Sequence, residues 1–375
     1  MSARKRKKKK LPTWAHPAIY AGVRTAVAGM QIAGPRSSMR LMRRFGGAFG
    51  SAGFNRARLE RAKDNLAWCF PDWSAERIEL CAVEAYRHLF TLAVELAVAP
   101  RMLAVDAYAA HVELGDLRDG LQRLLTGRPA VLVTGHCGNW ELLGTVLATL
   151  GFPMYALYRP LDVKALDRWV LRTRSATGMT LVDKFGGMSA MPRIMGEGGA
   201  VGFIADQNAG DRGMFVPFFD RLASAYKSVG VMAMHYNAPV ICGRARRLTG
   251  SFDPETSDDA LDELLRADAP LFRYRVDITE IITPEEWSQQ PDPLFYITAR
   301  YRRAIEQMVR DAPEQYLWMH RYWKSRPRHE RFGEPFPPRL RDKIAALPWM
   351  TPDELDRIVE RSARDAHDHA HSKRR

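Results

Sequence analysis

The sequence lacks the features that mark several large protein classes. Its 375 residues contain only four cysteines, at positions 69, 81, 137 and 242, and none forms a CxxC pair. This pattern excludes a disulfide framework and indicates a reducing compartment. The sequence also has no internal repeat and no long low-complexity stretch. With 46% hydrophobic and 26% charged residues, the chain is typical of a globular protein of one or two domains.

A strong transmembrane stretch is missing as well. The most apolar N-terminal segment, residues 17–35, is interrupted by Arg24 and Gln31. A spanning helix needs about 20 predominantly apolar residues, so this segment is a poor candidate for one. It is also a weak signal peptide, without a clear cleavage site. We therefore expect a helix that lies at the membrane surface.

An excess of charge is missing from most of the chain, although the formal net charge is +13. Residues 1–65 hold 16 Lys/Arg and 2 Asp/Glu, whereas residues 66–375 hold 40 and 41. This distribution argues against a nucleic-acid partner, and no nucleic-acid motif accompanies the basic arm. We expect residues 4–10 and 36–44 to contact an anionic membrane surface. A solvated tail and a nuclear-import or RNA-binding patch are the other interpretations of the lysine run.

From residue 130 onward, short apolar runs alternate with helical patterns, which predicts an α/β fold with a mostly parallel central sheet covered by helices. The expected strands are residues 130–134, 154–158, 179–182, 200–205 and 239–242, with a half-exposed edge strand at 272–277. The expected helices are residues 74–99, 139–150, 162–177, 187–197, 224–237 and 293–310. Ser74 is a candidate N-cap and Pro100 a candidate stop signal.

The most informative segment runs from Val131 to Gly144, VLVTGHCGNWELLG. A buried strand ends there in a glycine-rich turn that presents His136 at the carboxyl end of the sheet, where ligands bind in open α/β folds. If Glu141 accepts a hydrogen bond from one ring nitrogen, the other can act as a general base. The hydroxyl would belong to the substrate. On spacing alone, a His that merely caps a helix is the more common outcome. The neighbouring Cys137 is a poor nucleophile candidate, because adjacent side chains diverge.

This box resembles the His-x4-Asp/Glu box of the bacterial lipid A biosynthesis acyltransferases, the late lauroyl/myristoyl transferase family. Three further blocks are similar to that family, in order and at plausible spacing. They are Tyr158-Arg159-Pro160 with residues 166–175, Ala205-Asp206-Gln207-Asn208 with FVPFF at 215–219, and residues 313–327. The chain departs from the family pattern at residues 161–164 and 223–228 and in its weaker N-terminal apolar helix. These departures leave the acceptor lipid, the chain length and the mode of membrane attachment open.

The resemblance implies a glycerolipid-acyltransferase-like fold and the transfer of a fatty acyl chain. The donor would be acyl carrier protein or acyl-CoA, and the acceptor a hydroxyl of a lipid A precursor. It also implies work at the cytoplasmic face of the bacterial inner membrane, through peripheral binding or a single weak anchor, without cofactor or metal. Other membrane lipids remain alternative acceptors: a lysophospholipid, an aminolipid or a glycosylated phosphatidylinositol. A non-catalytic membrane-surface protein is the remoter alternative.

The residue pattern and the family resemblance together suggest a role for several residues. His136 and Glu141 are the expected catalytic pair, and the amides after Gly138, at the start of the helix near Asn139, are expected to bind the oxyanion. The expected substrate-binding residues are Arg159, Arg172, Arg174, Asp206 and Gln207. Their arginines suit phosphate groups, although surface positions on a helix are an equally good interpretation of Arg172 and Arg174. The aromatics at 215–219 either line an acyl channel or pack in the core.

Four segments are expected. They are a disordered polybasic arm (1–14), a membrane-associated helical region (15–65), an acyltransferase domain (66–345), and a short helix with a disordered tail (346–375). A capping-box pattern at Thr351–Glu354 opens that last helix. Alternating histidines at 367, 369 and 371 could bind a metal, but in a polar tail they are more often inert.

Overall fold

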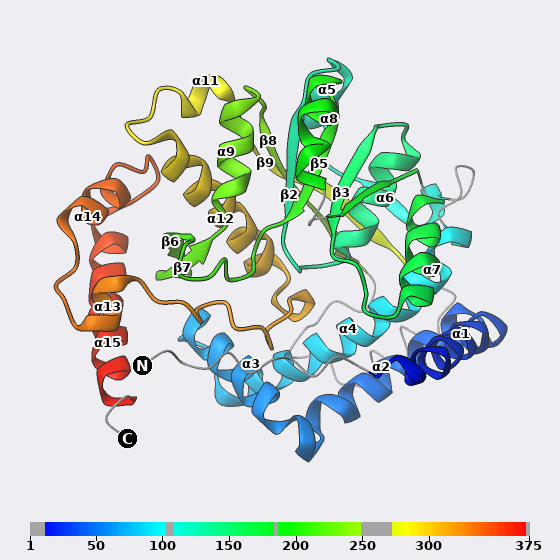
Figure 1. The fold of residues 1–375 in the computed structure, drawn as a ribbon. Coiled ribbons are helices and arrows are strands. Elements are labelled where there is room, and N and C mark those ends of the chain that lie inside the picture. Colours follow the sequence, from blue (N-terminus) through cyan, green and yellow to red (C-terminus); the bar gives the residue numbers. More distant parts are fainter. Residues whose placement is uncertain (1–11, 103–107, 177, 184–186, 249–271, 373–375) are drawn as a thin grey trace.

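The computed structural model describes residues 12–102, 108–176, 178–183, 187–248 and 272–372, and its centre is a seven-stranded sheet (Figure 1). The strand order is β1-β9-β8-β2-β5-β3-β4. The strands are β1 (Val112–Leu114), β2 (Ala130–Thr134), β3 (Met154–Tyr158), β4 (Thr180–Asp183), β5 (Ala200–Ile204), β8 (Val240–Arg247) and β9 (Tyr274–Ile282). All neighbouring strands run parallel except the β8–β9 pair. The predicted α/β class with a mostly parallel sheet is therefore confirmed.

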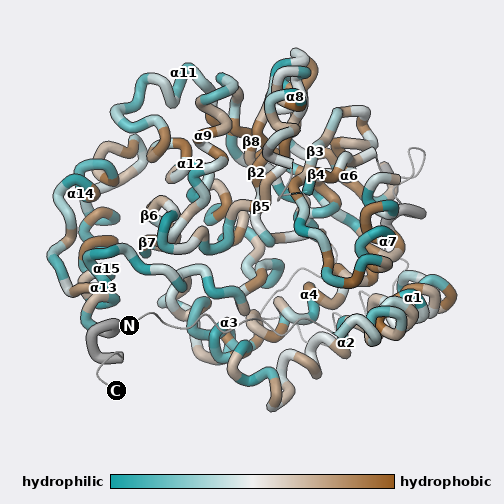
Figure 2. The backbone as a smooth tube through the Cα atoms, in the orientation of Figure 1, coloured by the Kyte–Doolittle hydropathy of each residue, from teal (hydrophilic) through white to brown (hydrophobic). Residues whose placement is uncertain are grey.

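Strand β2 lies in the middle of the sheet, between β8 and β5, and all five of its residues are buried. Figure 2 shows hydrophobic colour gathered on β2 and β8. A strand that is covered on both faces reads as a continuous apolar run, and the sequence AVLVT is such a run. Its register with β5 pairs Thr134 with Ile204, so both strands end at the same level of the sheet.

Two predictions about the strands are wrong. The segment expected at the edge of the sheet, residues 272–277, begins the nine-residue strand β9, whose outer side is covered by the short strand β1. Residues 221–225, expected partly in a helix, form β7 (Arg221–Ala225), which pairs with β6 (Met214–Phe218) in a separate antiparallel hairpin. Four of its residues, Leu222 to Ala225, are fully buried, so the demand for burial outweighs the weak helical pattern at 224–225.

Helices pack against both faces of the sheet, since the alternating residues of β2 contact different helices on either side. Around the chemical centre they are α5 (Arg118–Leu125), α6 (Trp140–Thr149), α7 (Lys164–Ser175), α8 (Met191–Gly196) and α9 (Lys227–His235). Short helical turns are η1 (Thr13–Ala15), η2 (Gly53–Asn55), η3 (Tyr108–Ala110), η4 (Gly187–Ser189) and η5 (Pro313–Gln315). The expected helix at 187–197 is split into η4 and α8.

The N-terminal region folds as α1 (His16–Ala33), α2 (Pro35–Ser51), α3 (Arg56–Cys69) and α4 (Ala75–Met102), which run along one side of the molecule (lower edge of Figure 1). The predicted cap is confirmed, because Ser74 Oγ accepts from the amide of Arg77 at 3.2 Å. Pro100 does not stop α4, which continues for two residues past it. A proline this close to a helix end removes a single hydrogen bond, so the cost is small.

The outer side of these helices carries exposed large apolar residues. Trp14, Ile32, Leu41, Phe45 and Phe54 are each more than half exposed. No helix among the described residues is long and apolar enough to cross a bilayer. The lysine run at 4–10 lies outside the described residues. Of the arginines at 36–44, Arg43 turns inward to a two-pronged ion pair with Glu84, so it does not contribute to an outer basic face as expected.

The C-terminal third contains α11 (Pro284–Trp287), α12 (Pro293–Asp311), α13 (Arg328–Phe332), α14 (Pro338–Ala345) and α15 (Pro352–Ser372). The predicted capping box is present, with Thr351 and Glu354 bonded to each other's amides. The final helix was expected to be short and to end in a disordered tail. Instead, α15 continues to Ser372. It is held to the body because Asp365 binds Arg221 at 2.7 Å, and its Ser362 bonds to His329 and Glu330.

Candidate active site

The turn between β2 and α6 is shaped by Gly138. Its φ is +59°, and a Cβ atom there would lie 2.0 Å from the carbonyl oxygen of Ala245. Only glycine avoids both the left-handed backbone penalty and this clash. The turn is further fixed by the buried His88, whose Nε2 donates to the carbonyl of Gly138 at 3.1 Å. Burial lowers the pKa of His88 well below its ordinary value, with the charge of Arg247 adding to the effect.

The amides of this turn are already occupied. The amide of Gly138 donates to the carbonyl of Gln315 at 2.9 Å, and the amide of Asn139 donates to the carbonyl of Ala245 at 2.8 Å. These two N–H groups are therefore not available to an oxyanion, which corrects the role expected for them. Asn139 instead caps α6, since its side chain accepts from the amide of Leu142 at 3.0 Å and donates to Glu95 at 3.0 Å.

His136 is oriented by Asp206. The Nδ1 atom of His136 lies 2.7 Å from one carboxylate oxygen of Asp206, and the backbone amide of His136 donates to the other at 3.0 Å. The expected partner of this ring nitrogen was Glu141, so that part of the sequence interpretation is wrong. The contact with Asp206 follows from the register of the sheet. Strands β2 and β5 end side by side at Thr134 and Ile204, and His136 and Asp206 each lie two residues beyond these ends.

The negative charge of Asp206 makes His136 a stronger base. Burial alone would lower the pKa of His136, but the charge and hydrogen bond of Asp206 outweigh it, and the pKa is raised. Burial likewise opposes ionisation of Asp206, yet His136 and the nearby Arg302 bring its pKa down to about 2. Asp206 therefore stays charged at neutral pH and holds the proton of His136 on Nδ1, leaving Nε2 free to accept one.

Three side chains surround the ring of His136. The ring of Trp140 meets it edge-on at 4.9 Å, and His320 stacks beside it at 5.7 Å. The amide nitrogen of Gln207 lies 3.5 Å from Nε2, the nitrogen that is not held by Asp206. Burial and the adjacent His136 both lower the pKa of His320, so the second imidazole is neutral at neutral pH.

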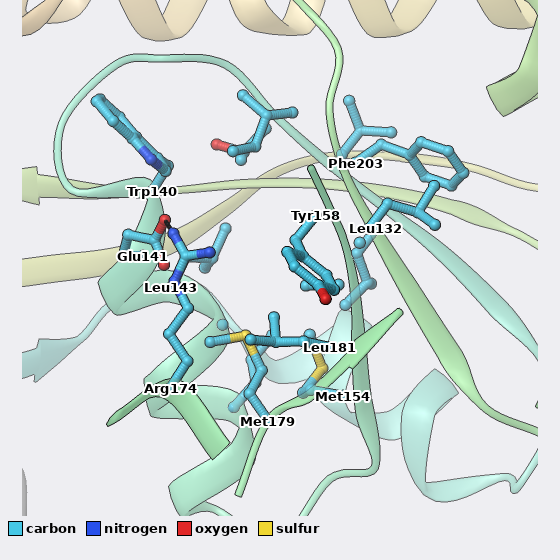
Figure 3. A pocket seen from close by; sticks show the side chains of 18 of the residues that line it. Leu132, Trp140, Glu141, Leu143, Met154, Tyr158, Arg174, Met179, Leu181 and Phe203 are labelled. Carbon is cyan, nitrogen blue, oxygen red and sulfur yellow. Dashed lines mark hydrogen bonds and ion pairs between the residues drawn. The ribbon is translucent and has the colours of Figure 1, made fainter. Parts of the chain in front are cut away.

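Glu141 lies in the first turn of α6 and forms an ion pair with Arg174 of α7 (Figure 3). It is close enough to His136 to add to the rise in that residue's pKa. The carboxylate and guanidinium bridge α6 and α7 at the point where both helices border a cavity.

That cavity has a volume of about 500 Å³ and begins at His136, Glu141 and Arg174. It extends between the sheet and helices α6 and α7, where leucine and methionine side chains line it (Figure 3). The aliphatic, methionine and phenylalanine side chains labelled there are Leu132, Leu143, Met154, Met179, Leu181 and Phe203. A largely apolar pocket with a few polar groups suits a ligand that has a reactive head and a hydrocarbon tail.

The remaining predicted residues separate into two groups. Arg159, Glu141 and Arg174 border the cavity, and Gln207 lies beside His136. Arg172 does not border it; this residue is exposed on α7 and only reaches back to the carbonyl of Arg168. Its alternative interpretation, a surface arginine, is the better one.

Two further candidates are resolved by burial. The aromatics of the FVPFF block do not border the cavity; Phe218 and Phe219 are buried in the core instead. Cys137 is also buried, and burial together with Asp206 raises its pKa to about 12, so the thiol is not an active nucleophile. Among the described residues no group of His, Cys, Asp and Glu is arranged to hold a metal.

Comparison with known proteins decides the family. The profile described as bacterial lipid A biosynthesis acyltransferase matches residues 2–259 and 267–325. The chain belongs to this family. It is an acyltransferase.

Relatives of this acyltransferase are similar over most of their length. It is 29% identical over 276 residues to the lipid A biosynthesis palmitoleoyltransferase of Escherichia coli K12, covering 73% of this chain and 81% of that protein. It is 23% identical over 284 residues to the lipid A biosynthesis lauroyltransferase of the same organism, with the same coverage. A lipid A biosynthesis acyltransferase of Haemophilus influenzae is 22% identical over 272 residues, covering 71% of this chain and 76% of that protein.

The structure gives the C-terminal block of this acyltransferase a supporting role. Gln315 accepts the amide of Gly138, and Tyr316 forms an isolated β-bridge with Cys137. These two contacts hold the His136 turn in place. His320 belongs to the same block and stacks beside His136. Sequence reasoning assigned no chemistry to this block, and no spacing pattern signals a contact between segments about 180 residues apart.

Proposed function

We propose that this acyltransferase moves a fatty acyl chain from an acyl thioester to a hydroxyl of a lipid A precursor, with His136 as general base. The observation that supports this most directly is the His136–Asp206 pair, which engages Nδ1 and leaves Nε2 without a carboxylate partner at an apolar cavity. The lipid A biosynthesis enzymes among its relatives support the acceptor class. We infer acyl carrier protein as the donor from the family resemblance alone.

The proposed reaction needs no acyl-enzyme. Nε2 of His136 takes the proton of the acceptor hydroxyl as its oxygen attacks the carbonyl carbon of the thioester. The C–S bond of the resulting tetrahedral intermediate then breaks, and the imidazolium returns the proton to the departing thiolate. Asp206 fixes the ring and stabilises the imidazolium in between, as the aspartate does in serine triads.

The oxyanion needs a donor other than the amides of Gly138 and Asn139. The side-chain amide of Gln207 is the candidate that lies nearest to the reactive nitrogen, at 3.5 Å. Glutamine side chains serve as oxyanion donors elsewhere. In this arrangement the Glu141–Arg174 pair borders the site of attack, where its guanidinium suits a phosphate of either substrate.

The acyl tail would occupy the cavity between the sheet and helices α6 and α7. Each buried methylene contributes about 0.8 kcal/mol, so a chain of ten or more carbons gains most of its binding energy there. The polar end keeps the thioester carbon beside His136. This placement leaves the acceptor to approach from the side of Arg159, which is exposed at the rim.

We also propose that the protein works at an anionic membrane surface, at the cytoplasmic face of the inner membrane. The exposed Trp14, Ile32, Phe45 and Phe54 are suitable for insertion below the headgroups, and the lysines at 4–10 for contact with anionic lipids. A membrane-bound acceptor is then presented directly to the enzyme.

The test is an assay of the purified enzyme with acyl carrier protein thioester and a bacterial lipid extract, read by mass spectrometry. We expect a lipid A precursor to gain one acyl mass. We expect His136→Ala to lose about 10²–10⁴-fold in rate while its melting temperature stays near that of the wild type. If only a lysophospholipid or an aminolipid gains mass, that lipid is the acceptor of the same reaction. Retention of a tenth of the activity by His136→Ala would reject the base assignment.

A further inference from the structure

A second pocket, polar rather than apolar, borders the support of the His136 turn. It has a volume of about 250 Å³ and lies among the start of α4, the end of β8 and the turn η5. Its lining combines four arginines with two carboxylates and two polar or aromatic side chains: Arg77, Arg246, Arg247, Arg310, Asp311, Glu314, Gln315 and Trp73. It shares no lining residue with the apolar cavity.

Three arginines in this pocket have buried nitrogen atoms without a hydrogen-bond partner. They are Nε of Arg77, Nε of Arg246 and Nη2 of Arg247. Arg247 is only 7% exposed, so its unpartnered nitrogen is held inside the protein rather than in solvent. A buried donor without an acceptor destabilises the fold unless a ligand or water supplies one.

The carboxylates in and near the pocket already have hydrogen-bond partners, and two arginines among these partners, Arg247 and Arg310, line the pocket themselves. Glu95 takes the Nη1 atom of Arg247, and Asp311 accepts from Arg244 and from Gln307. Arg310 binds Glu306 at 2.7 Å, and Glu314 accepts from Gln315 at 2.9 Å. Within the described ranges no ion pair involves Arg77 or Arg246. Four arginines and two carboxylates, Asp311 and Glu314, line the pocket, so its lining carries a net positive charge.

The pocket is organised before any ligand enters. The guanidinium of Arg77 stacks on Trp73 at 4.2 Å, and Trp73 in turn stacks on Phe70 at 4.2 Å with an angle of 15° between rings. Planar guanidinium groups held in fixed orientation match the tetrahedral oxygens of a phosphate, which accept several charge-assisted hydrogen bonds at once.

We propose that this pocket binds a phosphate group, and that the bound phosphate braces the His136 turn. Two contacts make the connection. The amide of Arg247 donates to the side chain of Gln315 at 2.9 Å, and the carbonyl of Gln315 accepts from Gly138. Arg247 also binds Glu95, which accepts from Asn139, the N-cap of α6. The inference concerns binding and does not rest on the proposed function.

The experiment titrates the full-length protein with inorganic phosphate and follows the melting temperature at constant ionic strength, with chloride as the reference anion. We expect phosphate to raise the melting temperature more than chloride, since a ligand that binds only the folded state stabilises it. Arg246→Gln should weaken phosphate binding roughly tenfold, and Arg77→Gln should do the same independently. Arg341→Gln is the matched control, because Arg341 is half exposed and pairs with Asp356 on another surface.

The outcomes are distinct. Equal shifts in phosphate and chloride, or a phosphate shift that survives in both pocket variants, would overturn the proposal. If one variant fails to fold, the other decides. Two esters then identify the source: tighter binding of glucosamine 1-phosphate than of inorganic phosphate supports a lipid headgroup, and tighter binding of 4′-phosphopantetheine supports the thioester donor. Equal binding of all three supports free phosphate as the ligand.

Discussion

Replacing Asp206 by Asn tests the orientation of the base most directly. The substitution keeps the size of the side chain but removes its charge, and it puts an amide where the structure has a carboxylate 2.7 Å from Nδ1 of His136. An amide N–H directed at Nδ1 favours the opposite tautomer, with the proton on Nε2, where it blocks proton abstraction. In the serine-protease triad the same exchange lowers kcat by about 10⁴-fold. We expect Asp206→Asn to lower kcat by about 10²–10⁴-fold, which corresponds to about 2.7–5.5 kcal/mol.

The pH profile separates orientation from general damage. Asp206 raises the pKa of His136, and the proposed reaction needs the neutral imidazole, so we expect wild-type kcat/KM to rise with pH through that raised value. Without the carboxylate, the pKa of His136 falls, and the acidic limb of the residual activity moves to lower pH. A limb that stays in place, or a residual activity above a tenth, would refute the reasoning.

The same variant also loses stability. The pKa of Asp206 is about 2 in the folded protein against an ordinary value of 3.8. A group with a depressed folded pKa stabilises the fold above its unfolded pKa, and that contribution is lost as the pH falls towards 2. The shift of almost two units corresponds to about 2 kcal/mol at neutral pH. Asp365→Asn is the control, since it removes another buried, ion-paired carboxylate far along the chain and should cost stability without moving the pH profile.

Three further results are expected. Gly138→Ala should lower the melting temperature by several degrees and reduce kcat, because its Cβ would lie 2.0 Å from the carbonyl oxygen of Ala245; unchanged thermal unfolding would contradict the close approach. Ala156→Phe should shift the donor preference to shorter acyl chains, because Ala156 borders the apolar cavity; competition between thioesters of different length measures this, and an unchanged preference would place the tail elsewhere. Deletion of residues 1–10 should weaken binding to anionic liposomes in a salt-dependent way without abolishing turnover on detergent-solubilised lipid, and sedimentation that matches the full chain would dismiss the tether.

Local patterns in the sequence predict much of the fold but little of what packs against the site. The apolar runs at 130–134 and 154–158 are the strands β2 and β3, because burial on both faces leaves a continuous hydrophobic signature. The capping box at Thr351 marks the start of α15 for an equally local reason. The helix expected at 224–237 begins only at Lys227, because residues 224 and 225 belong to the buried strand β7.

The part of the site that could be predicted consists of residues that directly follow expected strands. His136 and Asp206 are both expected at the carboxyl edge of the sheet, but the strand order that makes β2 and β5 neighbours is not written in either segment. The sequence therefore favoured Glu141, which is nearer along the chain, over Asp206, which is nearer in space. The occupied amides of Gly138 and Asn139 were missed because their acceptors, Gln315 and Ala245, belong to distant segments.

The register between β2 and β5 has a consequence for the enzyme during synthesis. Thr134 pairs with Ile204, and the reactive imidazole and its carboxylate each follow these partners by two residues. A slip of one residue would separate them, so the base becomes strong only after both strands have docked correctly. A nascent chain that ends before residue 206 carries the recognisable box but lacks the partner that activates it. We therefore expect partly made copies of the protein to be inactive, and recovery of activity on refolding to report the correct pairing of two strands.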